Sequence, residues 1–121
     1  MNILLIEPDK QLSAVYVAAF ETAGHTATAT PGAQNAIHIV EQTKFDLLII
    51  ELQLVDHNGI ELLYELRSYA EWQSIPAVIL TMVPPDALAV TPEILRQLGV
   101  VHCLYKPATS LATLLATIER M

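Results

Sequence analysis

Short apolar or β-branched runs alternate along this chain with segments in which apolar residues recur every three or four positions. A short run predicts a strand, and the wider spacing predicts an amphipathic helix. The strand candidates lie at residues 3–6, 26–30, 47–52, 77–81 and 101–105. The helical patterns that follow them are Leu12, Val15, Ala19 and Ala23; Ala36, Ile37 and Val40; Ile60, Leu63, Leu66 and Tyr69 or Ala70; a segment from near Pro92 to before Gly99; and Leu111, Leu114, Leu115 and Ile118. The pattern predicts five strand–helix units in succession.

Strict alternation of strands and helices is typical of a parallel sheet with right-handed crossovers and helices on both faces. The run at 47–52 belongs at the sheet centre, because it is nearly continuous in apolar residues. A chain of 121 residues has room for one hydrophobic core. We therefore expect residues 1–121 to form a single α/β domain, a doubly wound (βα)5 fold with five parallel strands.

The composition narrows the possible functions and locations. Six Lys and Arg against 13 Asp and Glu give a formal charge of −7, which repels nucleic-acid phosphates and anionic lipids. No apolar run approaches the roughly 20 residues that span a bilayer. The only cysteine, Cys103, has no internal disulfide partner, and the N-terminus lacks a leader-like pattern. We expect a cytoplasmic protein with no direct nucleic-acid partner and no membrane segment.

Polar residues stand at the carboxyl ends of four of the predicted strands. They are Glu7, Asp9, Glu51, Thr81 and Lys106. In open parallel sheets, ligands bind at the carboxyl ends of the strands, near the switch in strand order. The topology would thus gather carboxylates, a hydroxyl and an ammonium around one crevice. The structural alternative is that these residues cap helices or satisfy loops.

Several marks occur in a characteristic order. They are the acidic turn Glu7-Pro8-Asp9, Glu51, the turn Asp56-His57-Asn58-Gly59, Thr81 and Lys106-Pro107. With these marks the chain resembles, over essentially its whole length, a response-regulator receiver domain of two-component systems. The resemblance implies a flavodoxin-like sheet with strand order 2-1-3-4-5. It also implies a phosphoryl-accepting aspartate at position 51, a magnesium ion held by that residue and acids after the first strand, and phosphoryl contacts from Thr81 and Lys106.

The sequence departs from this family pattern at the centre of the crevice. Glu51 replaces the acceptor aspartate, and its extra methylene moves the carboxylate about 1.5 Å farther out. Such a displacement costs orders of magnitude in transfer rate. Pro8 stands where the family has a second metal-binding acid and brings no carboxylate. Glu7, Asp9 and Glu51 are the candidate ligands that remain for Mg²⁺, but we expect no cofactor and favour caps on the first helix for Glu7 and Asp9.

Two further positions differ from the family. Met82 follows Thr81 where a small residue is usual, and its long side chain is expected to cover part of the entrance. Cys103 stands where many members have an aromatic switch residue, so that switch is missing. We expect Cys103 to pack in the core as a small buried residue. The segment from Thr81 to Gly99 is longer than in a typical member and contains Pro84-Pro85, which suggests a rebuilt partner surface.

These observations predict a receiver-like signalling module that acts by protein–protein binding, is not an enzyme, and has weakened or absent phosphorylation. The longer Glu51 would bring negative charge towards Lys106 and Thr81, which partly imitates a phosphorylated aspartate and favours an active-like state. A plain ion pair with Lys106 is the structural alternative. The rival functions are a Mg²⁺-dependent phosphoacceptor using Glu51 or Asp56, and a small-molecule sensor that uses the crevice capped by Met82.

The expected partners are proteins: a histidine kinase, an effector or an output domain. The resemblance suggests a homodimer through the fourth helix, fifth strand and final helix. Tyr64, Tyr69 and Trp72 would either anchor a partner or pack around Pro76. Because the sequence ends just after the final helical pattern, we expect a stand-alone regulator or an excised receiver.

Overall fold

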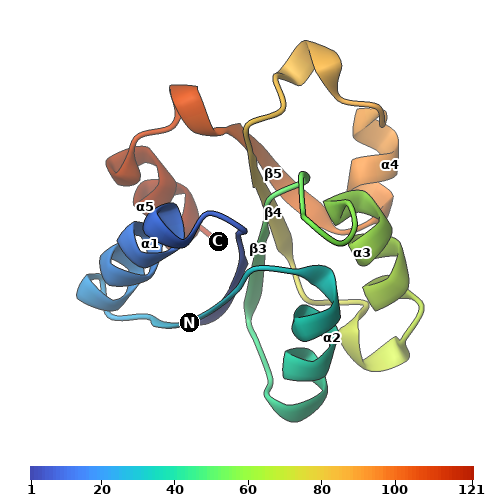
Figure 1. The fold of residues 1–121 in the computed structure, drawn as a ribbon, viewed down its shortest axis with the longest axis horizontal. Coiled ribbons are helices and arrows are strands. Elements are labelled where there is room, and N and C mark those ends of the chain that lie inside the picture. The colour runs from blue at the N-terminus through green and yellow to red at the C-terminus, as the bar shows by residue number, and fades with distance from the viewer.

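The computed structural model describes residues 1–121 and contains five parallel strands joined by helices (Figure 1). The strands are β1 (Asn2–Ile6), β2 (Thr26–Thr30), β3 (Leu47–Ile50), β4 (Ala77–Thr81) and β5 (Val100–Tyr105). The α-helices are α1 (Lys10–Thr22), α2 (Ala33–Gln42), α3 (Gly59–Arg67), α4 (Pro92–Gln97) and α5 (Leu111–Glu119). The sheet order is β2-β1-β3-β4-β5, which confirms the predicted doubly wound topology.

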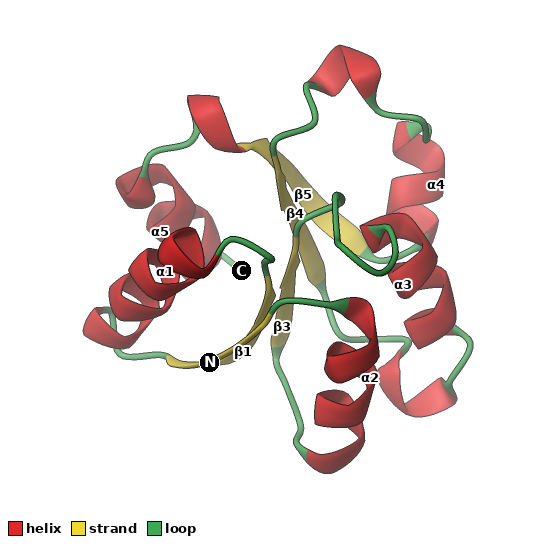
Figure 2. Ribbon diagram, in the orientation of Figure 1, coloured by secondary structure: helices red, strands yellow, loops and turns green.

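The sheet separates two layers of helices. Figure 2 shows α1 and α5 together on one face, and α2, α3 and α4 on the other. Successive strand residues alternate between two cores: Leu48 and Ile50 pack with α2 and α3, whereas Leu47 and Ile49 pack with α1 and α5. All four residues of β3 are fully buried. This explains why the central run is continuously apolar.

The strand register brings the candidate site residues to one edge of the sheet. Ile6 is the register partner of both Thr30 and Ile50, and Ile50 pairs in turn with Ile79. Thr81 is the register partner of Tyr105. The residues at and just after these strand ends therefore meet at the carboxyl edge of the sheet.

Local signals fix where the helices begin. Asn58 is the N-cap of α3 and accepts a hydrogen bond from the Glu61 N–H, while its side-chain amide donates to the Glu61 carboxylate at 2.5 Å. Such reciprocal contacts stabilise a helix start. The neighbouring Gly59 is sterically required, because a Cβ there would lie 2.7 Å from the Glu51 carbonyl oxygen. The start of α3 thus packs directly against the backbone of Glu51.

The buried face of α1 differs from its predicted face. Tyr16 and Phe20 are the buried residues of this helix, whereas Val15 is 47% exposed. The stripe through Val15 and Ala19 follows helical spacing, but the larger aromatic side chains of Tyr16 and Phe20, four positions apart, take the inward position. Burying them removes more apolar surface from water.

The prediction that Cys103 is a buried core residue is wrong. β5 is an edge strand, and Val101, His102 and Cys103 in its middle are all exposed. The apolar run predicted a strand correctly but not its burial.

The aromatic residues in and after α3 differ in exposure. Trp72 is buried, while Tyr64 and Tyr69 are 54% and 45% exposed. No helix in the chain combines the length and apolar character needed to cross a bilayer.

Candidate functional site

Glu51 lies immediately after β3 and is almost completely buried, with 3% of its surface exposed. Its carboxylate accepts four hydrogen bonds. Oε2 accepts from the Thr81 hydroxyl and, at 3.2 Å, from the Gln53 N–H. Oε1 accepts from the Met82 N–H at 3.1 Å and from the Lys106 ammonium at 2.7 Å. A carboxylate so fully engaged is a fixed structural element.

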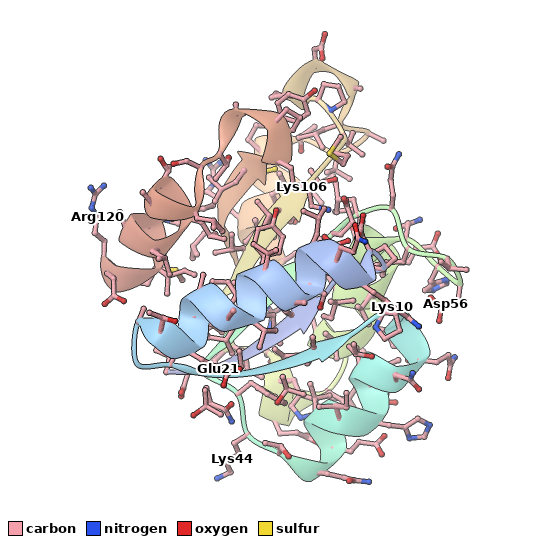
Figure 3. The ribbon with its side chains drawn as sticks, turned by 60° about the vertical axis from the view of Figure 1, so that its left-hand side comes forward. Lys10, Glu21, Lys44, Asp56, Lys106 and Arg120 are labelled. Atoms are coloured by element: carbon pink, nitrogen blue, oxygen red, sulfur yellow. The ribbon has the colours of Figure 1, made fainter.

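Lys106 joins two carboxylates from neighbouring strands. Its Nζ lies 2.5 Å from Glu7 Oε1 and 2.7 Å from Glu51 Oε1. All three side chains are almost fully buried, with exposures of 6% for Lys106, 2% for Glu7 and 3% for Glu51. Figure 3 shows Lys106 within the body of the molecule, above the start of α1. One ammonium therefore contacts two buried carboxylates. Hydrogen bonds from neighbouring groups to these carboxylates supply the remaining stabilisation.

The surroundings shift both protonation equilibria. Burial alone would raise the pKa of the Glu51 carboxyl, but the hydrogen bonds from Lys106, Thr81, Gln53 and Met82 outweigh it and the pKa is lowered. Burial alone would lower the pKa of Lys106, but its contacts with Glu51 and Glu7 raise it. Both groups are therefore charged at neutral pH, as an ion pair requires.

The acids after β1 have separate roles. Asp9 is the N-cap of α1, where its Oδ1 accepts from the N–H groups of Gln11 and Leu12 at 2.9 and 3.1 Å. Glu7 uses its second oxygen to accept the Asp9 N–H at 2.9 Å. The capping role predicted for Asp9 is confirmed. Glu7, by contrast, forms a buried cluster of charged side chains with Glu51 and Lys106, which we call the ion cluster.

These residues do not fit a magnesium ion in the arrangement described. The Lys106 ammonium already lies between Glu7 and Glu51, Asp9 caps a helix, and Pro8 supplies no carboxylate. No group of three or more His, Cys, Asp or Glu side chains in the chain is spaced to hold a metal ion. The Lys106 ammonium occupies the position next to the carboxylates that a bound cation would take.

Asp56, the alternative acceptor, lies away from this cluster. Its carboxylate accepts from the N–H groups of Ala33 and Gln34 at 3.1 and 3.3 Å and so caps α2 from another loop. These backbone hydrogen bonds lower the pKa of Asp56. In Figure 3 Asp56 lies at the edge of the molecule, well separated from Lys106. The N-cap residue of α2 is Gly32, which has no side chain that could accept a hydrogen bond. The Asp56 side chain from the loop after β3 therefore caps this helix.

Met82 enters the site through its backbone, and its side chain is 49% exposed. The site also contains groups that sequence reasoning missed, namely the N–H groups of Gln53 and Met82, and Tyr16. Burial raises the pKa of Tyr16, while the charges of Lys106, Glu7 and Glu51 act on it from nearby. Every residue has a backbone N–H, so residue identity gave no signal for the first two.

Comparison with known proteins identifies the family. The model of the response regulator receiver domain matches residues 3–119, and the chain belongs to this family. Receiver domains are signalling modules of two-component response regulators, which work with histidine kinases and output domains.

Two curated relatives match part of the chain. The two-component response regulator PhoP of Pseudomonas aeruginosa is 33% identical over 81 residues, which are 67% of this chain and 35% of that protein. The swarming motility regulation protein RssB of Serratia marcescens is 37% identical over 81 residues, which are 67% of this chain and 36% of that protein. The matched region thus spans about a third of the length of each relative.

Solved structures agree with the fold. The non-phosphorylated HemR receiver domain of Leptospira biflexa superposes with a TM-score of 0.81 at 27% identity, covering 98% of this chain and 91% of that one. A sensor protein from Polaromonas sp. JS666 gives a TM-score of 0.87 at 20% identity, covering 98% and 93%. At that identity the second likeness concerns the fold alone.

Proposed function

We propose that this chain is a receiver module of two-component signalling that works by protein–protein binding, with Glu51 fixing the contacts that a phosphorylated aspartate would otherwise make. One observation carries the proposal: a single carboxylate at the acceptor position holds the Thr81 hydroxyl and the Lys106 ammonium together. In the family pattern these two groups contact the phosphoryl group. Here the side chain of residue 51 is long enough to reach both.

Phosphoryl transfer to Glu51 is disfavoured by the same contacts. An attacking oxygen must be free and in line with the phosphorus, and a displacement of about 1 Å is enough to cost about 100-fold in rate. Both oxygens of Glu51 are occupied by two donors each. The one ammonium that would stabilise the transferring group is shared with Glu7. Phosphorylation is accordingly weakened or absent in this proposal.

In this proposal the binding partner is a histidine kinase, an effector or an output domain. The protein acts in a reducing cytosol. A homodimer through α4, β5 and α5 is part of the same proposal. This chain matches about a third of the length of PhoP and RssB, so the proposal does not include the activities of those whole proteins.

Backbone amide spectra test the proposed imitation of the phosphorylated state. Wild type, Glu51→Gln and the double variant Pro8→Asp/Glu51→Asp are compared by ¹H–¹⁵N NMR, the last with and without beryllofluoride and Mg²⁺. The wild-type signals of Thr81, Met82 and Val83 should resemble those of the loaded double variant, and Glu51→Gln should move them away. The proposal fails if wild type and Glu51→Gln give the same signals at these residues, or if wild type matches the unloaded double variant.

A further inference from the structure

A concave surface lies beside the ion cluster, between α3 and the segment that joins β4 to α4. Both elements are on the same side of the sheet (Figure 1). The groove has a volume of about 380 Å³. Its walls include Glu61 and Tyr64 of α3 on one side and Val83, Ala87, Leu88 and Val90 on the other. We call this surface the α3 groove.

The α3 groove leaves apolar side chains partly in water. Ile60, Val83, Leu88 and Val90 pack against the main core but are only partly buried. Tyr64 on the α3 wall is 54% exposed. Burial of such half-exposed side chains by a ligand is favourable in proportion to the apolar surface removed from water. The groove is therefore suited to apolar side chains of a partner.

The opposite wall also offers unused backbone groups. The N–H and C=O groups of Leu88, Ala89 and Val90 make no hydrogen bond within the chain. The short turn at Pro85–Ala87 ends before them, and α4 begins only at Pro92. A peptide can satisfy such groups with its own backbone while its side chains enter the apolar groove. A purely apolar small molecule satisfies only the second requirement.

The charges around the α3 groove are negative. Glu61 lines it and also contacts the side chains of Asn58 and His57, and Asp86 directly precedes the lining residue Ala87. No Lys or Arg is among the lining residues. We propose that the α3 groove binds a linear peptide segment of a protein partner, with apolar side chains in the groove and a lysine or arginine beside Glu61.

The groove is connected to the ion cluster through both walls. The Gln53 N–H donates to Glu51 Oε2, and the Val83 N–H donates at 3.1 Å to the Thr81 hydroxyl, which itself donates to Glu51. Loss of the Glu51 carboxylate would release the Gln53 N–H directly, and it would free the Thr81 hydroxyl that accepts from the Val83 N–H. Coupling between residue 51 and peptide affinity rests on the proposed function, whereas peptide binding itself does not.

A displayed library of random linear peptides, selected on the wild-type chain, tests the proposal. Enriched peptides should carry apolar residues next to Lys or Arg and should shift the amide signals of Tyr64 and Leu88 to Val90. Ala87→Trp, which fills the groove, and Tyr64→Ala should each weaken binding about tenfold or more, and Glu61→Gln, which keeps the Asn58 contact, should weaken it less. Val15→Lys on the exposed face of α1 is the matched control and should bind normally. All variants are first checked for unchanged melting temperature.

Three results would overturn the peptide site: no enrichment, enrichment of acidic peptides, or peptides that bind Ala87→Trp and Tyr64→Ala as well as wild type. The coupling is tested separately by measuring the same peptide on Glu51→Gln. A change in affinity of about fivefold or more supports coupling. Unchanged affinity leaves the peptide site standing but contradicts the proposed link to residue 51.

Discussion

The Lys106 ammonium lies 2.7 Å from Glu51 Oε1, and more than nine tenths of each side chain is buried. In this position a lysine from the end of β5 supplies the positive charge that the β3 carboxylate requires. Glu7 shares the same ammonium. Because the trio is closed to water, its removal or neutralisation has consequences for stability as well as for signalling.

Replacing Lys106 with Met should destabilise the fold by about 3–5 kcal/mol at neutral pH, since two buried carboxylates then face each other without a cation. Urea denaturation measures this. Lys44→Met, at an exposed position, is the control and should change stability by no more than about 0.5 kcal/mol. Equal stabilities for the two variants would show that the trio contributes nothing.

The pH dependence of stability follows from the signs of the two shifts. The pKa of Glu51 is lowered from 4.5 by folding, so its stabilising contribution is present above pH 4.5 and is lost as the pH falls through the folded value. The pKa of Lys106 is raised from 10.5, so its contribution is present below pH 10.5 and is lost as the pH rises through the folded value.

Thermal unfolding of wild type and Glu51→Gln across this range checks the acid limb. Glu51→Gln should be less stable at neutral pH, and the difference should shrink below pH 4.5. A constant difference from neutral to acid pH would contradict an ionised Glu51 in the folded protein.

Asp56→Ala should weaken the start of α2 and lower stability by about 0.5–2 kcal/mol, the usual cost of losing a helix cap. The reason is its contacts with the Ala33 and Gln34 N–H groups. Asp86→Ala is a matched control, because Asp86 makes no side-chain hydrogen bond in the structure. If the two variants unfold at the same denaturant concentration, the cap from the β3–α3 loop has no energetic role.

Millimolar Mg²⁺ should not raise the melting temperature of the wild-type chain, because Lys106 already lies between Glu7 and Glu51. The variant Pro8→Asp/Glu51→Asp restores the acids of the family pattern and should be stabilised by Mg²⁺. Ca²⁺ and added NaCl at equal ionic strength separate specific binding from screening. A rise in the wild-type melting temperature with Mg²⁺ alone would show that the wild-type residues do hold this ion.

The sequence was most informative about topology and about which residues follow each strand. The central burial of Leu47 to Ile50 could be predicted, because a continuously apolar run indicates a strand that is buried on both faces. The exposure of Cys103 could not, since an apolar strand has the same local pattern at the edge of a sheet as inside it. The N-cap of α1 at Asp9 could also be predicted, because the residue type and its position just before the helical pattern are the signals for a cap.

The contacts of the site were only partly predictable. Strand order brought Glu51, Thr81 and Lys106 together, but the sharing of Lys106 with Glu7 depends on rotamers that no sequence pattern specifies. The Gln53 and Met82 N–H donors come from backbone turns. The sequence therefore indicates which residues take part, and only the folded structure shows which atom each of them contacts.

Intact-mass measurement after incubation with acetyl phosphate and Mg²⁺ tests the central claim most directly. We predict that the wild-type chain keeps its mass, whereas Pro8→Asp/Glu51→Asp gains the mass of one phosphoryl group under the same conditions. A wild-type species heavier by one phosphoryl group, and lost in Glu51→Ala, would contradict the account.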